Sequence, residues 1–181
     1  MRKISALMLV LALAVPVLAQ QLAAPATTSP KVGEMAPDFV VKPGGRGGAA
    51  VNLKDYQGKQ NVLIEFFPGA FTPGCTQEFT DNGKEFDKYT ALNVAILGVS
   101  ADLPGALTQF KTTVGAKNDF VSDRDLSIAT KYGAQNPASP QPMRRFYFLI
   151  DQTGKIVWSD TTNSLILTDK LLPLVTQALK K

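Results

Sequence analysis

Runs of apolar residues divide the chain into alternating strands and helices. Two dense apolar runs, NVLIEFF at residues 61–67 and VAILGV at residues 94–99, predict strands that are buried on both faces. Each of them is followed by apolar residues at helical spacing, over residues 76–92 and 102–114. The remaining elements are expected to be short strands at residues 39–41, 51–53 and 120–121 and helices at residues 125–132 and 168–179.

The last third of the chain departs from this simple alternation. Residues 145–150 and 155–159 predict two strands joined by the turn DQTG, which together make a hairpin. Tyr147 and Trp158 in this hairpin are expected to be packing residues, as aromatic residues in strands usually are. The whole pattern predicts an α/β fold, a sandwich in which a central mixed β-sheet is flanked by helices. The order of the strands stays open.

The N-terminal segment has the layout of a secretory signal peptide. In residues 1–19, two basic residues precede an apolar run at residues 6–15, and small residues end at Ala19. The run is too short to span a membrane. We therefore expect export to a periplasm or beyond it, with no membrane attachment after cleavage. Residues 20–31 are expected to be a flexible lead-in, and residues 32–181 a single domain.

Charge and composition narrow the possible chemistry. The net charge of +4 is small, and two of these charges lie in the expected signal peptide, so no nucleic-acid partner is expected. The chain has no histidine, which excludes Ser-His-Asp and Cys-His catalysis and histidine-bound zinc. One cysteine cannot form a disulfide within the chain or a cysteine-rich metal site. The glycine-rich residues 42–50 fit a surface loop, and we expect no cofactor and no metal.

The single cysteine, Cys75, follows a buried strand and a short loop, and a helix is expected to begin at or near it. Ligands in α/β sheets bind beyond the carboxyl ends of strands, and the first turn of a helix stabilises a thiolate. Free cysteines are often merely buried. Here the loop holds two prolines, two glycines and the hydroxyl of Thr72, which suit a small polar substrate held by backbone amides. The surroundings therefore favour a reactive cysteine.

The segment from Pro68 to Cys75 fits the pattern P-x-x-x-T-x-x-C, and in this it resembles the active-site motif of the peroxiredoxins. Four more segments resemble that family in the same order along the chain: VGEMAPDF (32–39), LKDYQGK (53–59), DRDLSIATKY (123–132) and RFYFLID (145–151). The resemblance covers most of the expected domain. It implies a thioredoxin-like fold and the reduction of peroxides.

The resemblance also implies roles for residues of the motif. Cys75 would be the peroxidatic thiolate, which attacks a hydroperoxide and becomes a sulfenic acid. Thr72 would hydrogen-bond the thiolate and the peroxide, and Pro68 would shield the pocket from solvent. The backbone N–H groups of Gly74 and Cys75 would help to hold the peroxide.

Two charged residues complete the implied site. Arg145 would stabilise the thiolate and the negative charge that develops during the reaction. Glu78 would fix Arg145, although a solvated carboxylate near a helix N-terminus is the simpler alternative. Arg144 would take the place of Arg145 if the strand register differed by one residue.

The resemblance leaves the reductant open. TPGCTQEF is most similar to the peroxiredoxin Q (bacterioferritin comigratory protein) branch, and PGAFTPGC is similar to the atypical two-cysteine branch. Many peroxiredoxin Q proteins carry a second cysteine five residues after the first, where this chain has Thr80. A one-cysteine mechanism is therefore expected, with an external thiol that is either a small molecule or a thioredoxin-like protein. Either a monomer or a homodimer fits, and a Cys75–Cys75 disulfide between two chains stays open.

Two other functions remain as alternatives. An exported thiol-disulfide oxidoreductase on the same fold would normally need a C-x-x-C pair, and positions 72 and 78 hold Thr72 and Glu78 instead. A redox-inactive binding or chaperone-like protein would leave Cys75 without a reaction. Peroxide consumption by the reduced protein separates both from a peroxidase.

Overall fold

A computed structural model describes residues 28–41 and 50–180 of the chain. The expected signal peptide, residues 1–19, lies outside the described residues. Most of the expected lead-in and of the glycine-rich stretch also lies outside them.

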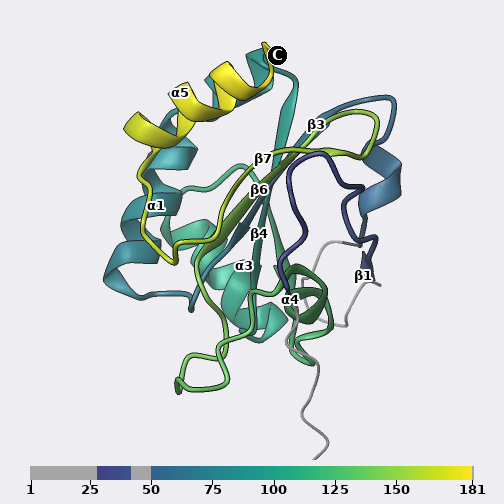
Figure 1. Cartoon of the computed structure of the whole chain (residues 1–181). Coiled ribbons are helices and arrows are strands. Elements are labelled where there is room, and N and C mark those ends of the chain that lie inside the picture. Colours follow the sequence, from purple (N-terminus) through teal and green to yellow (C-terminus); the bar gives the residue numbers. More distant parts are fainter. Residues whose placement is uncertain (1–27, 42–49, 181) are drawn as a thin grey trace, which may run out of the picture.

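The centre of the molecule is a five-stranded mixed sheet with the strand order β5-β4-β3-β6-β7 (Figure 1). The strands β3, β4 and β5 are parallel, whereas β6 is antiparallel to both β3 and β7. All six residues of β3 are buried, as its unbroken apolar run predicts for a central strand. The mixed sheet and the terminal hairpin are therefore confirmed. The bounds are β3 (Asn61–Phe66), β4 (Val94–Ser100), β5 (Asp119–Ser122), β6 (Phe146–Ile150) and β7 (Ile156–Asp160).

Helices cover both faces of this sheet (Figure 1). On one face, Leu63 and Leu149 pack in a cluster with Tyr89 of α2 and Leu171 of α5. On the other face, the sheet packs against Tyr132 of α4. None of the helices in the described ranges is long and apolar enough to cross a membrane. The bounds are α1 (Pro73–Lys84), α2 (Phe86–Ala91), α3 (Pro104–Thr113), α4 (Ser127–Tyr132) and α5 (Thr168–Ala178).

The expectation of one helix over residues 76–92 is wrong, because α1 and α2 are separate. The backbone leaves the helical conformation at Glu85, with φ −98° and ψ 8°. Phe79 packs with residues of α3, whereas Tyr89 packs in the cluster under α5. Because the two helices are separate, Phe79 and Tyr89 pack in different clusters. The spacing of apolar residues along the chain does not predict this tertiary packing.

A small two-stranded sheet lies before the main one. It pairs β1 (Val40–Val41) with β2 (Val51–Asn52) in antiparallel register. Leu53 was expected in the strand but begins a short 3-10 helix, η1 (Leu53–Tyr56). The side chain of Asn52 accepts a hydrogen bond from the backbone of Lys54 at 3.1 Å and so ends the strand there.

Candidate active site

The loop after β3 leads directly into α1, and Cys75 lies in the first turn of that helix. The helix begins at Pro73, whose fixed φ and missing N–H suit the first helical position. Thr72 precedes it in an extended conformation, and its carbonyl accepts from the backbone of Thr76 at 2.9 Å. Phe71 has a φ of 63°, a left-handed conformation that is strained for an aromatic residue. The loop therefore turns sharply just before the cysteine.

Arg145 reaches Cys75 because β6 runs antiparallel to β3. Phe146, the first residue of β6, pairs with Phe66, the last residue of β3, so the preceding Arg145 lies beside the loop that follows β3. Its Nη2 atom donates a hydrogen bond to Cys75 Sγ at 3.1 Å. The cysteine is fully buried and Arg145 is 7% exposed. A residue 70 positions away along the chain thus places a cation on the sulfur.

Glu78 holds the other side of the Arg145 guanidinium. It lies one turn after Cys75 on α1, is 1% exposed, and accepts a hydrogen bond from Arg145 Nη1. The hydroxyl of Tyr147 donates to its second carboxylate oxygen at 2.5 Å. Glu78 is therefore a buried partner of Arg145, and the alternative of a solvated surface charge is wrong.

Burial shapes the charges of this site. Desolvation lowers the pKa of Arg145, but Glu78 and Cys75 outweigh it, so the pKa lies above its ordinary value and the guanidinium stays charged. Desolvation raises the pKa of Glu78, and the charge of Arg145 and the hydroxyl of Tyr147 act in the opposite direction. Desolvation followed by the charges of Glu78 and Glu65 raises the pKa of Tyr147, which keeps its proton as a donor.

The other residues of the motif surround Cys75 without a hydrogen bond to it in the described part of the chain. The hydroxyl of Thr72 donates to the carbonyl of Gly69 at 3.0 Å. Gly74 lies close to the arginine, since a Cβ placed on it would be 3.7 Å from Arg145 Nη2. Pro68 and Thr72 line an open cleft of about 600 Å³ on the loop. The roles implied for these three residues stay predictions.

The register alternative with Arg144 is resolved by the contacts. The guanidinium of Arg144 lies 6.0 Å from the centre of the Phe146 ring, whereas Arg145 contacts Cys75. The backbone N–H of Arg145 also donates to Asn163 Oδ1 at 2.8 Å, which fixes the chain at this point.

Sequence reasoning missed several residues of the site. Trp158 is partly buried and packs against the cluster under α5, as expected, but Tyr147 does more than pack because its hydroxyl binds Glu78. The hydroxyl of Tyr147 also accepts from the backbone of Ile166 at 3.2 Å. Glu65 in the middle of β3 was a visible signal, because it is a charged residue inside an otherwise apolar run.

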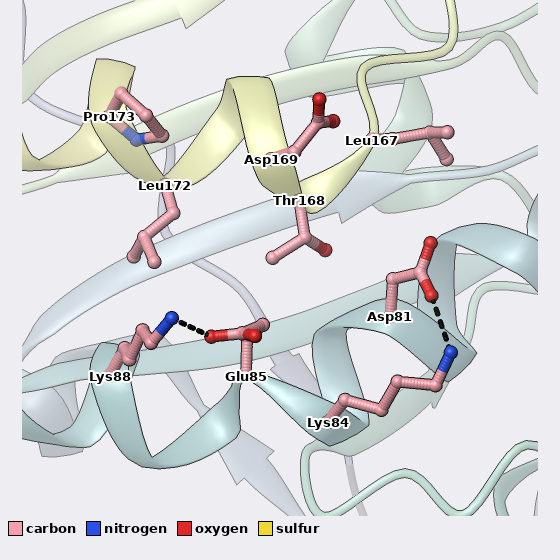
Figure 2. Close-up of a pocket in the computed structure, with 9 residues that line it drawn as sticks. All are labelled: Asp81, Lys84, Glu85, Lys88, Leu167, Thr168, Asp169, Leu172 and Pro173. Carbon is pink, nitrogen blue, oxygen red and sulfur yellow. Dashed lines mark hydrogen bonds and ion pairs between the residues drawn. The ribbon is translucent and has the colours of Figure 1, made fainter.

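A second hollow lies between α5 and the pair α1 and α2, away from Cys75. Figure 2 shows this groove, which has a volume of about 560 Å³. The ion pairs of Lys84 with Asp81, at 3.0 Å, and of Lys88 with Glu85 line it, so these charges satisfy each other. Within the described residues, no group of three or more His, Cys, Asp or Glu side chains is placed to hold a metal ion.

A model of the AhpC/TSA family matches residues 32–159 of the chain. The chain belongs to the AhpC/TSA family. Peroxiredoxin Bcp of Escherichia coli strain K12, a relative, is 34% identical over 131 residues, which cover 70% of this chain and 82% of that protein.

Two solved structures share the fold. The crystal structure of peroxidoxin BcpB from Mycobacterium tuberculosis matches with a TM-score of 0.71 and 21% identity, over 83% of this chain and 96% of that one. The bacterioferritin comigratory protein of Xanthomonas campestris, a structure described for alkyl peroxide reduction, matches with a TM-score of 0.63 and 24% identity, over 74% and 85%.

These similarities establish the class of enzyme. The chain is a peroxiredoxin with a thioredoxin-like fold, and it is similar in sequence to Peroxiredoxin Bcp. It is a thiol-dependent peroxidase, an oxidoreductase that acts on peroxides. The resemblance seen in the sequence is therefore confirmed.

Proposed function

We propose that Cys75 is the peroxidatic nucleophile and that this peroxiredoxin works by a one-cysteine mechanism with an external thiol. The observation that carries the proposal is the 3.1 Å hydrogen bond from Arg145 to the sulfur, in a chain with a single cysteine. A guanidinium beside a sulfur stabilises a thiolate, the form that attacks a peroxide. Thr80 stands at the position where a second cysteine would resolve the oxidised enzyme, so the resolving thiol comes from outside.

In the first half-reaction, the Cys75 thiolate attacks the terminal oxygen of the peroxide, and the O–O bond breaks. The sulfur keeps that oxygen as a sulfenic acid, and the other oxygen takes up a proton and leaves as water or an alcohol. Arg145 stabilises the negative charge that develops on the leaving oxygen. Thr72 and the backbone of Gly74 hold the peroxide, and Pro68 shields the site.

In the second half-reaction, an external thiol attacks the sulfenic sulfur, which releases water and leaves a mixed disulfide. A second thiol then attacks the mixed disulfide, releases the Cys75 thiol and leaves as the disulfide of the reductant. The sulfur of Cys75 is fully buried, so the first turn of α1 has to open for the external thiol to reach it. One peroxide thus consumes two thiols.

Stopped-flow measurement of peroxide consumption by the reduced protein tests the nucleophile. Hydrogen peroxide and several organic hydroperoxides are compared, with Cys75→Ser as the control. We expect fast consumption by the wild type only. Equal and slow consumption by both proteins would refute the role of Cys75.

Mass spectrometry after one equivalent of peroxide tests the one-cysteine mechanism. We expect a sulfenic acid on a monomeric chain, trapped by a sulfenic-acid reagent. Excess peroxide should then convert it to sulfinic acid, because no internal thiol competes. Prompt formation of a covalent dimer would contradict the mechanism and point to a Cys75–Cys75 disulfide between chains.

The pattern of residues 1–19 further supports export of this peroxidase to a periplasm or beyond it. The reductant would then be a thiol or a thioredoxin-like protein of that compartment. N-terminal sequencing of the protein from its native host tests this. A mature chain that begins after Ala19 supports export, and an intact N-terminus on the folded protein contradicts it.

A further inference from the structure

A line of buried polar side chains runs between α1 and the sheet and extends beyond Cys75. On α1, Cys75, Glu78 and Asn82 follow one another at helical spacing, so they share one face of the helix. On the sheet, Glu65 of β3 is the register partner of Tyr147 of β6. We refer to the following set as the polar seam: Glu65, Cys75, Glu78, Asn82, Arg145, Tyr147 and Thr168.

Glu65 joins three elements within this seam. It is fully buried, and the side-chain amide of Asn82 donates to its two carboxyl oxygens at 3.1 and 2.9 Å. The carbonyl of Asn82 in turn accepts from the hydroxyl of Thr168, the first residue of α5, at 2.6 Å. Figure 2 shows Thr168 pointing from α5 toward α1 and α2. Glu65 therefore connects the central strand to α1 and, through Asn82, to α5.

The seam holds one cation, Arg145, beside two carboxyl groups and the sulfur of Cys75. Arg145 contacts Glu78 and Cys75, whereas Glu65 forms no ion pair in the described part of the chain. Desolvation, followed by the charge of Glu78, raises the pKa of Glu65 well above its ordinary value, while Asn82 and Arg145 act in the opposite direction. The titratable groups that act on Glu65 are Glu78 on α1, Tyr89 on α2, Tyr147 on β6, and Arg145, which precedes β6.

We propose that Glu65, fully buried and hydrogen-bonded to Asn82, is a positioning residue for the peroxidatic site. It anchors Asn82, and so fixes the turn of α1 that carries Glu78 on Arg145. The raised pKa keeps Glu65 neutral. A neutral Glu65 does not compete with Glu78 and the sulfur of Cys75 for the charge of Arg145. An ionised Glu65 would add a negative charge that has no cation of its own and would weaken that pairing. This inference rests on the proposed role of Cys75.

Two substitutions on the same face of β3 test the anchor. Glu65→Leu removes the acceptor for Asn82, and Leu63→Val is a packing control that leaves the seam intact. The readouts are the rate constant for peroxide and the rate of Cys75 alkylation by iodoacetamide, which needs no peroxidase activity. We expect Glu65→Leu to lower both by about tenfold, the effect of one buried hydrogen bond. The control should change each by less than about twofold.

A third substitution tests the neutral form. Glu65→Gln keeps an acceptor for Asn82 but cannot ionise, so the ratio of its peroxide rate to that of the wild type should rise with pH. The alkylation rates should follow the same trend. A ratio that falls as the pH rises would mean that ionised Glu65 speeds the reaction, and it would overturn the requirement for a neutral Glu65.

The outcomes also separate this inference from the proposed function. Equal losses in Glu65→Leu and Leu63→Val would overturn the positioning role and leave a packing role. A wild type that does not consume peroxide would refute the proposed function, and the alkylation profiles would still test Glu65. If Glu65→Leu does not fold, Thr168→Val is measured instead, because this substitution removes the hydrogen bond between Asn82 and α5. Unchanged rates in Thr168→Val would count against the role of Asn82 as an anchor.

Discussion

At the scale of single residues, the site depends on how one buried cation is shared. Arg145 lies between the carboxylate of Glu78 and the sulfur of Cys75, and both contacts are shielded from water. Charge-assisted hydrogen bonds are strong in such surroundings, and an unpaired buried charge is costly. The proposed reactivity of Cys75 therefore depends on residues that are far from it along the chain.

The first prediction concerns this cation. Arg145→Gln removes the charge from the sulfur and from the leaving oxygen, so we expect the rate constant for peroxide to fall by about 100-fold. Arg144→Gln is the matched control, because Arg144 contacts the ring of Phe146 and not the cysteine. Stopped-flow kinetics of the two variants decide the matter. Similar rate constants in the two variants would show that Arg145 has no special role.

The second prediction concerns the hydroxyl that supports Glu78. Tyr147→Phe deletes the hydrogen bonds to Glu78 and to the backbone of Ile166 and leaves the ring in place. Tyr132→Phe on the other face deletes one hydrogen bond to the carbonyl of Pro37. Both variants should lose about 1 to 3 kcal/mol of unfolding free energy. Only Tyr147→Phe should slow the peroxide reaction, and equal rates would place Tyr147 outside the site.

At the scale of elements, α1 lies very close to the sheet, and a glycine makes the approach possible. A Cβ on Gly98 of β4 would lie 2.7 Å from the ring of Phe120 and 3.1 Å from that of Phe79. Phe79 follows Cys75 by one turn of α1, so the fit between helix and strand sets the height of the cysteine above the sheet.

The third prediction tests this fit. Gly98→Ala forces Phe79 and Phe120 to move, and overpacking of this kind lowers the unfolding free energy by about 1 to 3 kcal/mol. Gly105→Ala in α3 is the control, because no atom lies within 4 Å of its added Cβ. It should stabilise the protein by about 0.5 to 1 kcal/mol through the helix propensity of alanine. Urea unfolding measures both, and a stable Gly98→Ala would contradict the close packing.

At the scale of the whole molecule, buried carboxyl groups link stability to pH. Glu65 and Glu78 both have a pKa above the ordinary value of 4.5, chiefly because they are desolvated. Below that value the folded and unfolded states both hold the protons. Above it the unfolded state releases them first, so rising pH favours unfolding until the folded groups also titrate. The contribution of these two groups to the unfolding free energy is therefore fully present at acidic pH and is lost as the pH rises.

The fourth prediction follows from this linkage. The unfolding free energy of the wild type should fall as the pH rises above the ordinary carboxyl pKa of 4.5, by at most about 1.4 kcal/mol per pH unit for each group. Glu65→Gln removes the titration of Glu65, so its curve should be shallower. Urea unfolding at several pH values compares them, and parallel curves would mean that Glu65 does not hold its proton.

Much of the fold was predictable because its signals are local. The apolar runs gave the central strands β3 and β4, the turn DQTG gave the hairpin of β6 and β7, and Gly133 caps α4 in the left-handed conformation that glycine favours. The break between α1 and α2 was not predictable, because it depends on the packing of the two helices against two separate clusters. The strand order was not predictable either, since the sequence pattern of a strand does not show which other strand pairs with it.

The sequence by itself determined the chemistry of this protein. The motif from Pro68 to Cys75 indicated a peroxidase through its resemblance to the peroxiredoxins, and the single cysteine indicated that there is no second internal thiol. Only the tertiary structure decided that Arg145 and not Arg144 reaches the sulfur, and that Glu65 lies in the same buried seam. The reason is physical: strand register and helix packing bring these side chains together across tens of residues, and burial then decides their charges.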